Sequence, residues 1–177
     1  MPDEKKNLYL FEAIELRKEY DRHIKLMEKL LKEGDDRSDR LFRSRDEDEK
    51  EHAPGFDLKK IETELKKLKV KRIKLNHKIQ EANFKCQVDV NGDSISIAEA
   101  LEVRKNLLND IESISQRVIS SAYKRIIHKE KRDIVKKPKQ PFEKVYDNYI
   151  DTIEKIRTIV DNIHIANHRN VVSFKEE

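Results

Sequence analysis

Apolar residues recur at alternating steps of three and four positions in four long segments of the chain. In the first segment, positions 10, 13, 17, 20, 24, 27 and 31 are Leu, Ala, Arg, Tyr, Ile, Met and Leu. A helix has about 3.6 residues per turn, so this spacing predicts one apolar face of a helix. The same spacing recurs from Ile61 to Ala82, from Ile97 to Val118 and from Val145 to Ala166. Each of these apolar faces, hereafter stripes, must pack against another apolar surface. We therefore expect a mainly α fold in which the four helices form a four-helix bundle.

The chain also resembles itself. Shifted by 87 residues, 10–18 falls on 97–105, and the match runs on to Ile24 over Ile111. Identical residues meet at Glu12, Ala13, Glu15, Arg17, Lys18 and Ile24. Shifted by 84 residues, 79–83 falls on 163–167 and ends on a shared Ala-Asn. We interpret the chain as a single domain, 1–177, built from two duplicated helical hairpins at about 8–90 and 95–174. The alternative is a chance resemblance between amphipathic segments.

Short strands are predicted at the ends of the helices. Val88, Val90, Ile95 and Ile97 surround Asn91-Gly92, a dipeptide typical of two-residue β-hairpin turns. By the duplication, 7–10 and 170–174 are the matching outer strands, which would close a small β-sheet of short strands at one end of the bundle. Ser96 and Glu99 have the spacing of a capping box, so the third helix is predicted to begin near Ile97.

Composition narrows the class of protein. Charged residues make up 42% of the chain and hydrophobic residues 36%, with 3 Gly and no Trp, which favours long amphipathic helices over a compact sheet enzyme. Segment 35–52 has eight acidic and five basic residues and predicts a mobile charged loop. No apolar run approaches the roughly 18 residues of a membrane span, and the start lacks the apolar core of a signal peptide. With the lone Cys86, these features predict a cytoplasmic protein that does not bind membranes.

No motif indicates catalysis, a metal or a cofactor. His164 and His168 have the spacing of two metal ligands on a helix, but no third ligand accompanies them. Asp89, Asn91 and Asp93 imitate the start of a calcium loop, yet Ser94 and Ala100 stand where that loop needs Gly and Glu. The chain has no phosphate-binding glycine loop and no nucleophile motif. We therefore expect no enzymatic activity and no cofactor.

Two segments are strongly basic. Segment 59–78 has nine basic and two acidic residues, and segment 124–139 has eight basic and two acidic ones. Such segments can neutralise phosphates of nucleic acid. The candidate contacts in the second segment are Lys124, Arg125, Lys129, Lys131, Arg132, Lys136 and Lys137. The lysines of 59–78 flank an apolar stripe, as solvated helix faces do, and no aromatic residues are interleaved for base stacking, so the sequence favours the solvated interpretation.

Arg17 and Arg104 occupy stripe positions at the same place in each repeat, which predicts that both are mostly buried. In antiparallel hairpins they would lie level with Asn83 and Asn167, and Glu99 is among the possible charge partners. We expect a buried polar clasp that fixes helix register, and the alternative is a pocket for an anion or small ligand built from the same groups.

These positions also carry a resemblance to a known family. The pattern comprises Arg17, Asn83, Gly92, Glu99-Ala100-Leu101, Arg104 and Asn167, and it spans about residues 8–172. It resembles the bacterial septicolysin family, small helical proteins whose role is essentially uncharacterised. The chain departs from that family in its long charged loop at 35–52 and in having His168, where Trp is expected after the Asn.

The sequence thus predicts a non-enzymatic helical interaction or scaffold protein, with a protein partner or self-association as a homo-oligomer. The alternative is a nucleic-acid-associated protein that uses the basic faces of 59–78 and 124–139. A third hypothesis, an enzyme with an unfamiliar site, would require a deep pocket with perturbed titratable groups near Arg17 or Arg104.

Overall fold

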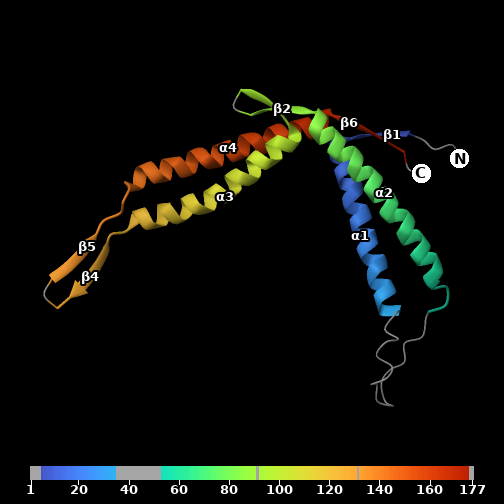
Figure 1. Ribbon diagram of the computed structural model, residues 1–177, viewed down its shortest axis with the longest axis horizontal. Coiled ribbons are helices and arrows are strands. Elements are labelled where there is room, and N and C mark those ends of the chain that lie inside the picture. The colour runs from blue at the N-terminus through green and yellow to red at the C-terminus, as the bar shows by residue number, and fades with distance from the viewer. Residues whose placement is uncertain (1–4, 35–52, 91, 131, 176–177) are drawn as a thin grey trace, which may run out of the picture. The chain divides into compact units, whose positions relative to one another are not determined.

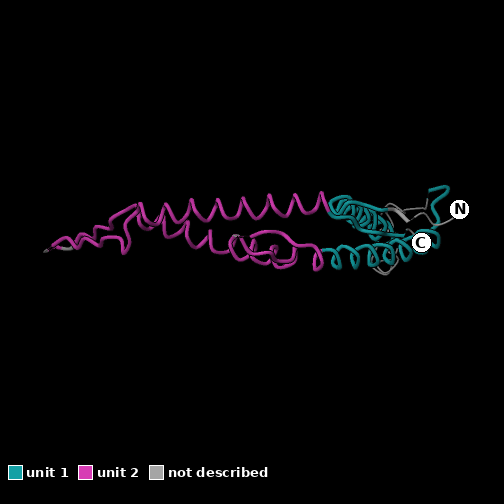
Figure 2. The backbone as a smooth tube through the Cα atoms, turned by 90° about the horizontal axis from the view of Figure 1, so that it is seen from above, with its two compact units in different colours: residues 1–82, 170–177 teal, residues 83–169 magenta. Residues whose placement is uncertain are grey.

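A computed structural model describes residues 5–34, 53–90, 92–130 and 132–175. The predicted charged loop, 35–52, lies outside the described residues. The chain divides into two compact units, which Figure 2 colours separately. Unit 1 comprises 1–82 and 170–177, and unit 2 comprises 83–169.

Unit 1 contains a helical hairpin and one pair of strands (Figure 1). Strand β1 (Lys5–Tyr9) leads directly into helix α1 (Leu10–Gly34), and helix α2 (Leu58–Lys85) runs back beside α1. Strand β6 (Val171–Lys175) pairs with β1 in antiparallel register. The apolar side of the unit includes Leu10, Ala13, Leu75 and Ile79, each at most 1% exposed.

Polar pairs connect α1 to α2. Nη1 of Arg17 donates to Oδ1 of Asn76 at 2.9 Å, and Nε of Arg72 donates to Oδ1 of Asp21 at 2.9 Å. An ion pair of 2.7 Å joins Lys69 Nζ to Oε1 of Glu28 further along. From Arg17 to Glu28 the residues of α1 advance along the chain, while their partners on α2 run backwards from Asn76 to Lys69. This order is that of an antiparallel hairpin.

Unit 2 contains the second hairpin, α3 (Ile97–Ala122) and α4 (Phe142–Arg169), with a strand pair at each end (Figure 1). Strands β2 (Gln87–Val90) and β3 (Asp93–Ser96) lie where α3 begins. Strands β4 (Arg125–Lys129) and β5 (Arg132–Lys136) extend from the other end. The Asn162 side chain of α4 holds β2 by donating to the carbonyl oxygen of Asp89 at 2.7 Å.

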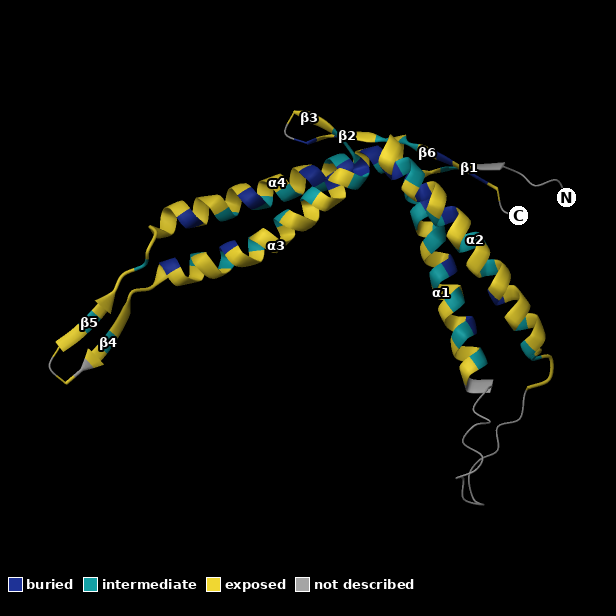
Figure 3. Ribbon diagram, viewed as in Figure 1, coloured by how far each residue is buried: buried dark blue, intermediate teal, exposed yellow. Residues whose placement is uncertain are grey.

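The predicted apolar stripes are confirmed on all four helices. Almost every stripe position is buried or half-buried, as the colouring of Figure 3 illustrates along each hairpin. In α4, for example, the stripe residues Val145, Thr152, Ile159, Ile163 and Ala166 are all buried. The exception among the four stripes is Arg104, which is exposed.

The junction between strand and helix has the same hydrogen bond in both units. The amide of Leu10 donates to the carbonyl of Asn170 at 2.8 Å, and the amide of Ile97 donates to the carbonyl of Cys86 at 3.0 Å. The repeat shifts of 87 and 84 residues convert one pair into the other. The strand registers correspond in the same way, with Leu8 opposite Val172 and Ile95 opposite Val88.

The helix caps correspond as well. The carboxylate of Glu12 accepts from the amide of Tyr9 at 2.8 Å, and that of Glu99 accepts from the amide of Ser96 at 2.8 Å. The predicted capping box at Ser96 is confirmed, and α3 begins at Ile97. The junctions thus match under the predicted repeat shifts, and each strand pair combines the first strand of one predicted repeat with the last strand of the other. The duplication itself stays a prediction.

The β structure differs from the prediction. The predicted 88–95 hairpin is confirmed, with a positive φ of 91° at Gly92 that favours glycine at this turn. A single sheet was expected, but the described strands form three separate two-stranded sheets, β1–β6, β2–β3 and β4–β5. The three pairs stand at different places on the helices: β1 and β6 contact α1, β2 and β3 contact the start of α3, and β4 and β5 follow its end.

The prediction of a mainly α fold with four helices and short antiparallel strands is confirmed for the described residues. Packing of the two hairpins into one bundle stays a prediction. Strands β4 and β5 were not predicted at all, and they occupy the basic segment that the sequence suggested as an alternative binding site.

Candidate functional site

The basic segment 124–139 forms a two-stranded antiparallel ribbon, β4–β5, hereafter the ribbon. Helix α3 ends at Ala122, and Tyr123 has extended backbone angles of φ −128° and ψ 138°, so the chain passes directly from the helix into β4. After β5, Pro138 and Pro141 precede α4, whose first turn includes a bond from the Val145 amide to the Pro141 carbonyl at 3.3 Å. A proline at this point suits a helix start because its missing N–H would have no helical partner.

Alternation along the strands gives the ribbon two different faces. Arg125 lies opposite Lys136, so this cross-strand pair combines like charges, and Arg132 lies on the same face as Lys136. Pairs of like charge directly opposite each other destabilise a sheet. The other face includes the ribbon's described ion pair, between His128 Nδ1 and Asp133 Oδ1 at 2.9 Å.

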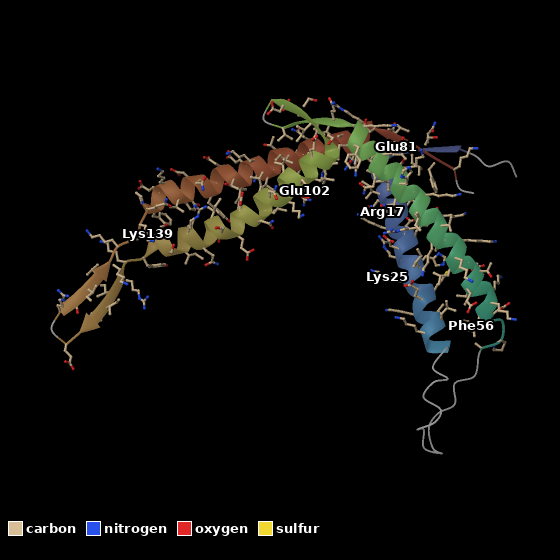
Figure 4. All side chains as sticks on the ribbon, in the orientation of Figure 1. Arg17, Lys25, Phe56, Glu81, Glu102 and Lys139 are labelled. Atoms are coloured by element: carbon tan, nitrogen blue, oxygen red, sulfur yellow. The ribbon has the colours of Figure 1, made fainter. Side chains whose placement is uncertain are left out.

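A pocket of about 510 Å³ lies at the base of the ribbon, within unit 2. Residues from α3, the ribbon and the start of α4 line it. The cationic residues of its lining are Arg117, Arg125, Lys136, Lys137 and Lys139, and no acidic residue belongs to it. Figure 4 labels Lys139 at the end of the α3–α4 hairpin where the ribbon begins.

The pocket and the ribbon form one cationic surface. We define the basic track as Arg132, Lys136, Arg125, Arg117, Lys137 and Lys139, all of them exposed. Within the part of the chain that the structure describes, none of these six side chains has an ion-pair or hydrogen-bond partner. The track therefore presents positive charge that no described carboxylate neutralises.

Exposed aromatic rings flank the ribbon on both sides. Tyr123, which lines the pocket, is 77% exposed. At the start of α4, Phe142 stacks on Tyr146 with ring centroids 5.6 Å apart, and Tyr146 on Tyr149 at 6.5 Å. These rings could not be recognised from the basic segment 124–139 because they stand outside it rather than within it.

The other basic segment, 59–78 on α2, is partly neutralised. Lys69 and Arg72 pair with Glu28 and Asp21 of α1, and Lys78 pairs with Glu81 at 2.9 Å. Lys69 lowers the pKa of Glu28 chiefly through its hydrogen bond to that carboxylate. The ribbon is therefore the stronger candidate of the two basic segments.

The first of the two expected clasps has a different partner from the predicted one. Arg17 is half-buried and bonds Asn76, seven residues before the expected partner Asn83, while its Nε is buried without a partner among the described residues. Asn83 is 8% exposed. The alignment of Arg17 with Asn83 was wrong because α1 and α2 pair in a different register.

In the second repeat, the expected burial of Arg104 is wrong. Its side chain is exposed, and Oδ1 of Asn167 is buried without a partner in the described residues. The shift of 84 places Val160 at the position of Asn76, so α4 offers Arg104 no amide oxygen at that position. Glu99 is exposed and serves as the helix cap, and its bonds from Ser96 lower its pKa.

Other candidate chemistry is sparse in the described residues. Among them, no group of three or more His, Cys, Asp or Glu side chains could hold a metal ion. Burial raises the pKa of the Cys86 thiol, which disfavours the reactive thiolate at neutral pH. None of the helices in the described ranges has the length and apolar character needed to cross a membrane.

Comparison with known proteins gives one similar solved structure. It is the crystal structure of a functionally unknown conserved protein from Corynebacterium diphtheriae, with a TM-score of 0.65 and 19% sequence identity. The match covers 94% of this chain and 99% of that chain. No family model and no curated protein matches the sequence. The similarity shows the fold alone, and the resemblance to the septicolysin family stays a prediction.

Proposed function

We propose that this protein is a non-enzymatic binding protein that holds nucleic acid on the basic track of unit 2. The observation that carries the proposal is the Arg125–Lys136 cross-strand pair, which places like charges opposite each other at the mouth of a pocket without acidic lining. Such an arrangement costs stability in the free protein. A polyanion with regularly spaced phosphates would offset that repulsion.

The shape of the ribbon suits this ligand. A two-stranded antiparallel ribbon is narrow enough to enter a nucleic-acid groove or to lie along a strand. From Arg132 to Lys136 the strand advances about 13 Å, so the track extends over several phosphates. We place the activity in the cytoplasm, where a lone thiol such as Cys86 stays reduced.

The salt dependence of binding tests the proposal. If the six cations of the track each neutralise one phosphate, raising salt from 50 to 200 mM weakens binding by about 300-fold for a single strand and about 2,000-fold for a duplex. Fluorescence anisotropy with labelled oligonucleotides measures this slope. Replacing both Arg125 and Lys136 by Gln should reduce the slope by about 1.4 on a single strand.

The matched control removes two charges from the other basic segment. Lys66 and Lys67 are exposed on α2, and the Lys66→Gln/Lys67→Gln variant should bind as the parent protein does. Equal losses in the two double variants would refute the assignment to the ribbon. Absence of binding to any oligonucleotide at 50 mM salt, or binding only to vesicles that contain anionic phospholipid, would refute nucleic acid as the ligand.

Self-association is the second candidate function, and a different observation favours it. In unit 1, Leu26 and Leu30 stand one turn apart on α1 and are 55% and 38% exposed. Val70 and Ile73 do the same on α2, at 50% and 63%. Sedimentation velocity over a range of concentrations should reveal a dimer that Ile73→Ser weakens, and a monomer at every concentration would contradict this candidate.

A further inference from the structure

We infer that the nucleic acid bound by unit 2 is single-stranded, with one base seated against Tyr123 in the pocket and the phosphates following the basic track. This inference rests on the proposed function and specifies its ligand. It comes from the combination of a cationic pocket with exposed aromatic rings, a combination that a paired duplex cannot use because its bases are stacked on one another.

The pocket has the size and chemistry for one nucleotide. Its volume of about 510 Å³ lies within the range of about 300–1,000 Å³ typical of small-molecule sites. Val145 and Pro138 supply apolar lining, and the ring of Tyr123 supplies a stacking surface. The cations surround these groups, as required by a ligand that joins an aromatic base to a phosphate.

Hydrogen bonds already made inside the pocket limit the contacts that its serine hydroxyls can make with a ligand. The hydroxyls of Ser120 and Ser121 donate to the carbonyls of Arg117 and Val118 in their own helix, at 3.0 and 2.8 Å. They can therefore accept a hydrogen bond from a base but are not free to donate to a phosphate. Donation to the phosphate falls to the arginine and lysine side chains, which deliver charge-assisted bonds.

The stacked rings of Phe142 and Tyr146 on α4 provide the next stacking surface. Phe142 and Tyr146 are 43% and 45% exposed, although apolar rings gain by burial. Phe142 follows the pocket residue Gln140 by two positions, and Tyr146 follows the pocket residue Val145 directly. Rings beside a cationic groove are the arrangement by which proteins bind single strands without reading sequence, because every base has a face that can stack.

The test compares a labelled single strand of about 12 nucleotides, a length within known site sizes, with the duplex of the same sequence. The full-length protein should bind the single strand more tightly. Tyr123→Leu should weaken single-strand binding by about 5- to 150-fold and leave the salt slope unchanged, because it removes a stacking contact and no cation. Tyr146→Leu, on the helix surface, provides a second variant in case the first alters folding.

The control is Phe84→Leu, which removes a 70% exposed ring of unit 2 that lies outside the pocket lining and should leave the affinity unchanged. Circular dichroism and thermal melting establish that each variant is folded. Duplex binding as tight as single-strand binding overturns the inference but leaves the proposed function standing. Parental affinity in both Tyr123→Leu and Tyr146→Leu overturns it too, whereas failure to bind either oligonucleotide refutes both.

Discussion

Reversing the charge of Lys136 should stabilise the ribbon and weaken nucleic-acid binding at the same time. Lys136 lies directly opposite Arg125, so Lys136→Glu replaces a repulsive cross-strand pair by an attractive one. A substitution that only damaged the fold would lower both properties. Ribbon stability and nucleic-acid affinity are expected to change in opposite directions only if the like charges serve to bind a ligand.

The size of the effect follows from the register. Charged groups of opposed side chains stand about 6 Å apart and repel by about 0.7 kcal/mol in water. Changing the sign is therefore worth about 1.4 kcal/mol, and screening at physiological salt reduces this to about 0.7 kcal/mol. That free energy corresponds to an increase of about threefold in the protection of the ribbon's amides.

Amide hydrogen exchange followed by NMR measures the ribbon, with the Ile127 and Ile134 amides as reporters, and anisotropy measures oligonucleotide affinity. Lys137→Glu is the control, because Lys137 follows β5 and has no cross-strand partner. It makes the same change in net charge, so it should weaken binding without protecting the ribbon. Unchanged or lower protection in Lys136→Glu, or equal protection in Lys137→Glu, would refute the reasoning.

Three further predictions concern the helical hairpins. Arg17→Leu should lower the free energy of unfolding by about 1.5 kcal/mol because it leaves an amide oxygen of α2 without its donor, whereas Arg104→Leu, at an exposed position, should change it by less than about 0.5 kcal/mol; urea denaturation compares them. Ser96→Ala should cost about 1 kcal/mol by removing the α3 cap, and Ser113→Ala, at an exposed position within the helix, should not be destabilising in the same assay. Because the pKa of Glu99 is lowered by its bonds from Ser96, its contribution is complete above the ordinary value of 4.5 and is lost as pH falls through the lower folded value; Glu99→Gln should remove this part of the acid dependence of thermal melting.

The helices could be predicted because a periodic signal summed over about 25 residues outweighs local exceptions. The start of α3 could be predicted because Ser96 and Glu99 provide a reciprocal cap whose spacing is fixed by one helical turn. The turn at Gly92 followed from the positive φ that its hairpin requires. In each case, the backbone's own hydrogen-bonding needs restrict the residues that fit.

The ribbon could not be predicted from the same reasoning because its many charged residues interrupt the apolar alternation that indicates a strand. The signal was present in Ile126-Ile127 and Ile134-Val135, two β-branched pairs on either side of a short polar turn. Lysine and arginine supply no apolar alternation, and the strands bury little: Ile127 and Ile134 are half-buried, and the neighbouring described side chains of both strands are exposed. Charge density alone therefore does not distinguish a solvated loop from a basic strand pair.

Whether each of the two arginines is buried or exposed depends on residues far away in sequence. Arg17 and Arg104 occupy identical repeat positions, but Asn76 of α2 corresponds to Val160 of α4. A guanidinium group is buried only where an acceptor compensates for its lost hydration, so only Arg17 is drawn inward. A stripe position identified on one helix cannot reveal what the facing helix offers.

The two hairpins also differ at a second pair of facing positions, and this difference bears on function. The Asp21–Arg72 ion pair of unit 1 corresponds, by the same shifts, to Leu108 and Ile156 in unit 2. The hairpin that carries the ribbon thus has apolar residues at these two positions, with Ile156 half-buried and Leu108 43% exposed. Apolar contacts between α3 and α4 are insensitive to salt and to a bound polyanion, whereas ion pairs would be competed by phosphates. A hairpin held by such contacts can present unpaired cations at its tip without exposing its own core interactions to the ligand.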